Sequence, residues 1–217
     1  MTPEQLFTTV VQVAVLLFAV SVHESAHGLV ALRFGDTTAR DLGRITLNPI
    51  RHLDPLGSLL IPAVLAFTGA PVFGWAKPVP VDLRGVPNPR RAHLWVSAAG
   101  PLSNLALALA FGAAVALLRP FRGAPELAAV AVPLFFVAAY GTLVNVSLAL
   151  FNLLPVPPLD GFGVVEGVAP VQLYPKLFWL RRYGFLILAV LVFTGAFRYV
   201  LGPPQAAVLR WLVGGPS

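Results

Sequence analysis

The sequence predicts an all-α polytopic membrane protein with about four spanning helices, one re-entrant or interfacial segment, and short extended stretches near the cytoplasmic face. Three observations predict this class. Hydrophobic residues make up 57% of the 217 positions and charged residues only 11%, whereas soluble domains carry about 25% charged residues. Apolar residues form several long runs, and a spanning helix needs about 20 of them in succession. Arginine and lysine lie mostly between these runs, as they do in cytoplasmic loops of membrane proteins.

The first spanning helix is predicted over residues 3–34. Thr2 is a favoured N-cap residue and Pro3 suits the first helical turn. Gly35 followed by Asp36 is a typical stop signal. Residues 6–20 contain no charged side chain, so this run is well suited to the interior of a bilayer.

The next segment is basic and polar, with one apolar run inside it. Residues 44–49 alternate as in a strand and end at a turn signal. Residues 57–70 are apolar, but this run is short and broken by Pro62 and Gly69. Residues 75–81 are predicted to be extended, because a residue that precedes proline is excluded from the helical region.

Three further spanning helices are predicted over residues 93–118, 127–150 and 185–201. The first of them includes residues 98–104, where small side chains permit close helix approach. The second is followed by three prolines within residues 155–158, which stop a regular helix. Residues 1–217 are expected to form one domain.

One motif in the first helix indicates chemistry. His23-Glu24-Ser25-Ala26-His27 has the pattern His-Glu-x-x-His. Histidines four residues apart lie on one helix face and can bind one metal ion, and Glu24 beside them can act as a general base. An ionisable residue at the centre of a membrane helix costs about 2.5–3.5 kcal/mol on insertion scales. Three such residues within five positions therefore indicate a function, which we interpret as zinc binding.

The motif needs a further ligand, because a catalytic zinc site takes three protein ligands and keeps one position for water. The chain has no cysteine, so this ligand must be a histidine or a carboxylate. Asp160 is the best candidate, since it lies in the proline-broken stretch after a spanning helix; the alternative is an aspartate that ends a helix at the water interface. Asp54 is the runner-up. The sequence thus predicts one Zn²⁺ per chain, held by His23, His27 and Asp160.

The order of the spanning helices tests this ligand set. If residues 57–70 do not cross the membrane, the next two spanning helices return Asp160 to the side on which His27 lies. If they did cross, Asp160 would lie about 30 Å away, beyond the reach of a zinc bond of about 2 Å. We therefore expect residues 57–70 to be re-entrant or interfacial, and the basic loops and the active site to face the cytoplasm.

Three other polar residues stand near these elements. Asn152 precedes Asp160 on the same broken stretch, and two roles remain open for it. Its amide can donate a hydrogen bond to a developing oxyanion, or it can satisfy carbonyl groups at the end of its helix. His52 and His93 lie beside loops and are interpreted as interfacial polar residues.

These motifs together resemble the site-2 protease family of intramembrane zinc metalloproteases. The resemblance lies in His23-Glu24-Ser25-Ala26-His27, in Ala99-Gly100-Pro101-Leu102-Ser103-Asn104, and in Asn152-Leu153-Leu154-Pro155 followed by Leu159-Asp160-Gly161. Residues 43–49, 52–55 and 75–80 resemble the short branch of the family, which is mostly bacterial and archaeal.

The resemblance implies hydrolysis of a transmembrane segment of a membrane-protein substrate, usually after another protease has trimmed its outer part. It implies zinc ligands at His23, His27 and Asp160, a catalytic Glu24, and an Asn152 that assists at the substrate carbonyl. It also implies a bacterial or archaeal cell membrane. Family members often add a PDZ domain or paired cystathionine-synthase-type domains, and this chain is expected to have neither.

Two alternative functions use the same residues differently. A zinc transporter or other metal-binding membrane protein would need the histidines but not Glu24 as a base. A proteolytically silent relative would bind membrane helices without hydrolysing them. The net charge of +6 is assigned to the loops and not to nucleic-acid binding, and the oligomeric state stays open. Under the protease hypothesis, a substrate can add as a strand to residues 45–47 or 79–81.

Overall fold

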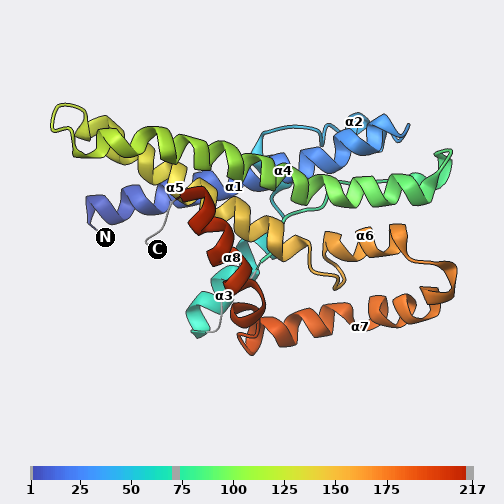
Figure 1. Cartoon of the computed structure of the whole chain (residues 1–217). Helices are drawn as coiled ribbons and strands as arrows, with labels where there is room; N and C mark the ends of the chain where they lie inside the picture. Colours follow the sequence, from blue (N-terminus) through green and yellow to red (C-terminus); the bar gives the residue numbers. More distant parts are fainter. Residues whose placement is uncertain (1, 70–73, 214–217) are drawn as a thin grey trace.

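Helices make up most of the computed structural model, which describes residues 2–69 and 74–213 (Figure 1). No strand is formed within these residues. The α-helices are α1 (Pro3–Arg33), α2 (Thr38–Asp41), α3 (Ile61–Thr68), α4 (Pro89–Leu118), α5 (Ala128–Asn152), α6 (Asp160–Val168), α7 (Tyr174–Phe193) and α8 (Phe197–Val213).

Among the described residues, α1, α4 and α5 are long and apolar enough to cross a membrane, and α7 with α8 forms a pair bent by 76° that can serve as one broken span. The protein is therefore an all-α polytopic membrane protein, as predicted. The bounds predicted for the fourth spanning helix, residues 185–201, are wrong. The chain is already helical from Tyr174, and the helix breaks at Gly195, whose φ of 68° is the left-handed conformation that ends a helix.

The helix α4 packs against α1, α5 and α6. Small residues on α4 permit these close approaches, and Gly100, Ala108 and Gly112 are buried. At the start of α1, the predicted cap is present: the Thr2 hydroxyl accepts a hydrogen bond from the Gln5 backbone, and the Gln5 side chain accepts one from the Thr2 backbone.

The strand predicted over residues 44–49 is not formed. The Thr46 N–H donates to the Ser25 hydroxyl, at 3.1 Å, and the Ser25 hydroxyl donates back to the Thr46 carbonyl, at 2.8 Å. His52 Nε2 also lies 2.8 Å from that carbonyl. Because side chains satisfy both backbone groups of Thr46, this segment follows the surface of α1 in bends and pairs with no neighbouring strand.

The apolar run at residues 57–70 forms a short helix over Pro55–Thr68, with Ala70 outside the described residues. This helix is too short to be counted among the candidate spans. Its length agrees with the expectation of a re-entrant or interfacial segment. The side chain of Asp54 caps the N-terminus of this helix by accepting hydrogen bonds from the N–H groups of Leu56 and Gly57.

Candidate metal centre

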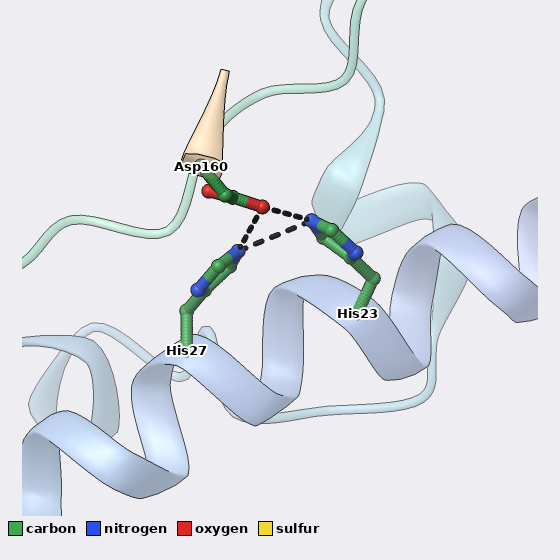
Figure 2. Close-up of side chains that lie close together, drawn as sticks. All are labelled: His23, His27 and Asp160. Carbon is green, nitrogen blue, oxygen red and sulfur yellow. Dashed lines mark hydrogen bonds and ion pairs between the residues drawn. The ribbon is translucent and has the colours of Figure 1, made fainter. Parts of the chain in front are cut away.

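Two elements that are far apart in the sequence bring His23, His27 and Asp160 together (Figure 2). His23 and His27 lie one turn apart on α1, and their Nε2 atoms are 3.1 Å from each other. The Oδ2 atom of Asp160 lies 3.1 Å from His23 Nε2 and 3.4 Å from His27 Nε2. The convergence of these three residues, which the zinc-ligand hypothesis predicted, is therefore present in the structure.

A sharp turn after α5 delivers Asp160 to the histidines. The helix α5 ends at Asn152, and residues 153–159 turn back so that Asp160 is the first residue of α6. Gly161 permits this return, since a Cβ atom there would lie 2.2 Å from the Leu153 carbonyl oxygen. The three prolines predicted to stop the helix lie inside this turn.

Hydrogen bonds that the Nδ1–H groups donate fix the tautomers of both histidines. His27 Nδ1 lies 2.7 Å from the Val96 carbonyl oxygen, and His23 Nδ1 lies 2.6 Å from Asn104 Oδ1. Both partners only accept, so each Nδ1 carries the hydrogen and each neutral ring presents a lone pair at Nε2. Metal-bound histidines are held in this way by a second hydrogen bond.

The role of Asn104 was not predicted from the sequence. Its Nδ2 donates to Asn145 Oδ1 at 2.8 Å, and Asn145 Nδ2 donates to the Gly141 carbonyl at 2.9 Å. Because a carbonyl cannot donate, this chain of bonds leaves Asn104 Oδ1 facing His23. Both asparagines are fully buried within predicted spanning helices. Their polarity inside apolar runs is the signal that could have identified them.

The three ligand atoms fit a cation. Both Nε2 atoms and the carboxylate oxygen are acceptors, and Asp160 Oδ2 is buried without a hydrogen-bond donor among the described residues. Three lone pairs that converge without a donor repel one another unless a positive ion lies between them. The ligand atoms of a tetrahedral zinc ion lie about 3.3 Å apart, given bonds of about 2.0–2.1 Å. The observed separations of 3.1–3.4 Å match this value.

Gly100 on α4 leaves room beside these atoms. A Cβ atom at this position would lie 2.5 Å from His27 Nε2 and 2.6 Å from His23 Nε2. A methyl group would therefore occupy the space next to both ligand nitrogens. The small residues of 98–104 were predicted to permit helix packing, and this glycine also serves the site.

Glu24 is half-buried, next to His23 on α1. Its Oε2 atom accepts a 2.8 Å hydrogen bond from the Val79 N–H, whereas Oε1 has no hydrogen-bond partner among the described residues. One carboxylate oxygen is thus oriented by the protein and the other is available to a proton donor.

Four other polar residues named from the sequence are not part of the group formed by His23, His27 and Asp160. Asn152 Nδ2 donates to the Leu148 carbonyl of its own helix. Asp54, the runner-up ligand, caps the helix at Pro55 and is not part of the metal-binding group. His52 is 2% exposed, and its Nε2 atom lies 2.8 Å from the Thr46 carbonyl oxygen; its place at the membrane interface stays a prediction. His93 is partly exposed and lies 3.3 Å from Glu166 Oε2.

A pocket of about 420 Å³ adjoins Asp160. It lies between α4, α6, α7 and the turn after α5, and one wall is polar. There, Arg181 donates to both oxygens of Glu166, at 2.6 and 2.7 Å. The pocket can admit water to one side of the metal-binding group. The residues that line it include His93, Ser97, Asp160, Gly163, Glu166 and Arg181.

The fold and the site define a polytopic membrane protein with a group of two histidines and a carboxylate that could hold a metal ion. The chain is 43% identical, over 191 residues, to "Putative zinc metalloprotease YwhC" of Bacillus subtilis; the match covers 88% of this chain and 84% of that protein. The chain belongs to this zinc metalloprotease family.

Two mycobacterial relatives carry the name "Putative zinc metalloprotease Rip2". The protein of Mycolicibacterium smegmatis is 34% identical over 180 residues, which are 83% of this chain and 65% of the relative. The protein of Mycobacterium tuberculosis is 32% identical over 184 residues, which are 84% of this chain and 66% of the relative. No family model matches the chain, and no solved structure does.

Proposed function

We propose that residues 1–217 act as one intramembrane zinc metalloprotease domain of the site-2 protease type. The reaction is hydrolysis of a peptide bond in or near a transmembrane segment of a membrane-protein substrate, as a step of regulated intramembrane proteolysis. One observation carries the proposal. The acceptor atoms of His23 and His27 on the candidate span α1 converge with Asp160 Oδ2, which has no hydrogen-bond donor among the described residues, and Glu24 follows His23 in the sequence.

His23, His27 and Asp160 would hold one Zn²⁺ per chain. Zinc suits a site of two imidazoles and one carboxylate with an open position. When bound, zinc lowers the pKa of its water ligand to about 7 and polarises a carbonyl group. The hydrogen bonds from His23 to Asn104 and from His27 to Val96 keep both rings in the required tautomer.

Glu24 would act as the general base. Its free Oε1 takes a proton from the water that attacks the scissile carbonyl, and Glu24 then returns a proton to the leaving amine. The Val79 N–H holds the other oxygen at 2.8 Å, so the carboxylate keeps one orientation during both transfers. Asn152 would assist by donating to the developing oxyanion; one of its two amide N–H groups donates to the Leu148 carbonyl and the other is available for this bond.

A substrate must be unfolded before cleavage, because a helix buries its peptide bonds in hydrogen bonds. Strand addition at residues 45–47 has no support, since the Thr46 backbone already binds Ser25 and His52. Residues 79–81 remain suitable. The Val81 N–H has no hydrogen-bond partner among the described residues, and Val79 places this edge beside Glu24.

The proposed orientation places the basic loops and the active site toward the cytoplasm of a bacterial or archaeal cell membrane. Arg40, Arg90 and Lys176 are exposed residues of these loops and helix ends. The positive-inside rule assigns such residues to the cytoplasmic side.

Metal analysis with Glu24→Gln separates the candidate functions. We expect about one zinc per chain in the wild type and in Glu24→Gln, with cleavage of single-span substrates only by the wild type. A zinc transporter would keep its transport activity in Glu24→Gln. A silent helix-binding relative would keep full function after His23→Phe. Cleavage by Glu24→Gln at the wild-type rate, or a wild-type protein without metal, would refute the proposal.

A further inference from the structure

Residues 75–82 form a strap that crosses beside α1 and is hydrogen-bonded along its length. The Lys77 N–H donates to the His52 carbonyl at 2.9 Å. The Val79 N–H donates to Glu24, and the Asp82 N–H donates to Asp36 at 2.7 Å. The strap therefore joins the end of α1, the segment after it, and the proposed general base.

The side chain of Arg44 donates hydrogen bonds to two carbonyl groups of the same strap. One terminal nitrogen of the guanidinium donates to the Lys77 carbonyl at 2.9 Å and to the Pro78 carbonyl at 3.3 Å. Arg44 is 8% exposed, and its Nε atom is buried without a hydrogen-bond partner within residues 2–69 and 74–213. No carboxylate pairs with Arg44 in the described part of the chain. A buried charge without a counter-ion is destabilising by several kcal/mol. The buried Arg44 side chain therefore indicates a functional role.

One peptide group connects Arg44 to Glu24. The carbonyl of Pro78 and the N–H of Val79 belong to the same amide. Its oxygen accepts from the guanidinium, and its N–H donates to the Glu24 carboxylate. A cation on the oxygen polarises the amide and strengthens the hydrogen bond that the N–H makes. The positive charge of Arg44 thus acts on the carboxylate of Glu24 through one intervening amide.

We propose that Arg44 is a positioning residue for catalysis. It fixes the 78–79 amide, and this amide fixes the carboxylate of Glu24 in the orientation that proton transfer needs. Arg44 touches neither the substrate nor the reacting atoms in this assignment. The proposal rests on the proposed role of Glu24 as general base.

The test compares Arg44→Gln, Arg44→Lys and the control Arg51→Gln. Arg51 is exposed in the same basic segment, and its replacement changes the net charge equally. The probe is a fluorescence-quenched peptide with one transmembrane segment, supplied in detergent micelles. We expect kcat of Arg44→Gln to fall about tenfold to a hundredfold, because small misplacements of catalytic groups have effects of that size. KM and zinc content should stay near wild type, and Arg51→Gln should match the wild type throughout.

Arg44→Lys should recover part of kcat, because an ammonium keeps the charge but not the planar guanidinium. Faster hydrogen exchange at the Val79 amide should accompany the loss in Arg44→Gln, and this readout needs no activity. Unchanged exchange, an unchanged kcat, or an equal loss in Arg51→Gln would each overturn the proposal. If Arg44→Gln does not fold, kcat and hydrogen exchange at the Val79 amide are compared between Arg44→Lys and the wild type, and this comparison tests the proposal. A wild type without proteolysis would refute the proposed function instead, and the Val79 exchange would still test the Arg44 contact.

Discussion

Two buried asparagines, Asn104 and Asn145, form a chain of hydrogen bonds that ends at His23. Asn104 orients the imidazole through its Oδ1, and Asn145 orients Asn104 in turn. Neither asparagine is a metal ligand, yet both are fully buried within apolar helices. Burying unpaired amides would be costly, and their mutual hydrogen bonds remove that cost while selecting the tautomer of His23.

Replacing Asn104 should weaken metal binding. In Asn104→Leu the Nδ1–H of His23 loses its acceptor, so the ring is no longer held in its tautomer and orientation. Changes of this kind lower metal affinity by about 10–100-fold, and we expect that range for the zinc dissociation constant measured by chelator competition. Thr142→Val is the control, since the Thr142 hydroxyl is buried but binds only Ala138 of its own helix. An unchanged zinc affinity in Asn104→Leu would show that the network is not needed.

Gly100 should tolerate no side chain. A Cβ atom at this position would lie 2.5 Å from His27 Nε2, so Gly100→Ala must displace the histidines or fill the ion's space. We expect the purified variant to contain little or no zinc by elemental analysis. Gly112→Ala on the same helix is the control, because its Cβ would meet the movable side chain of Leu212 at 3.2 Å. Full zinc content in Gly100→Ala would contradict the geometry of the site.

At the scale of elements, Asp36 joins the end of α1 to the 75–82 strap. Its Oδ1 accepts from the Thr38 N–H at 2.9 Å, and its Oδ2 accepts from the Asp82 N–H at 2.7 Å. Burial by itself would raise the pKa of Asp36, but the hydrogen bonds from Thr38 and Asp82 outweigh it and lower this pKa below its ordinary value of 3.8. The ionised carboxylate therefore stabilises the folded protein.

The sign of this pKa shift predicts a pH dependence. The stabilisation is complete above the unfolded pKa of about 3.9 and is lost as pH falls through the lower folded pKa. Asp36→Asn should reduce the free energy of unfolding at neutral pH by about 1–3 kcal/mol, because one strap N–H loses its acceptor. The difference between wild type and variant should shrink below about pH 4, measured by thermal unfolding in detergent. A difference that is equal at pH 3 and pH 7 would contradict this account.

At the scale of the whole molecule, the site exists only if both of its elements reach the same side of the membrane. The spans α4 and α5 form the return path between His27 and Asp160, and the short helix of Pro55–Thr68 is excluded from the candidate spans by its length. Figure 1 shows α7 below α6, and α8 packs against α5. The ion pair between Arg181 and Glu166 ties α7 to α6.

This topology can be tested directly because the natural chain contains no cysteine. We expect Arg40→Cys and Lys176→Cys to react with a membrane-impermeant maleimide only after the cells are permeabilised, since both positions are assigned to the cytoplasm. Arg122→Cys, in the loop at the opposite ends of α4 and α5, should react in intact cells. All three positions are exposed. Labelling of residues 40 and 122 from the same side would contradict the helix order.

The sequence by itself determined the membrane class, the approximate bounds of α1, α4 and α5, and the group His23, His27 and Asp160. These features follow from local rules: long apolar runs form spanning helices, and residues four apart share a helix face. The helix order then required the carboxylate to return to the histidines.

Only the tertiary structure decided what surrounds that group. The Asn104 bond to His23, the space at Gly100, and the path from Arg44 through the strap to Glu24 depend on contacts between segments that are distant in the sequence. The bends at residues 44–49 and the break at Gly195 also escaped prediction. Alternation of apolar residues indicates which side chains along a segment are exposed. It does not determine whether side chains or a neighbouring strand form the hydrogen bonds of the backbone.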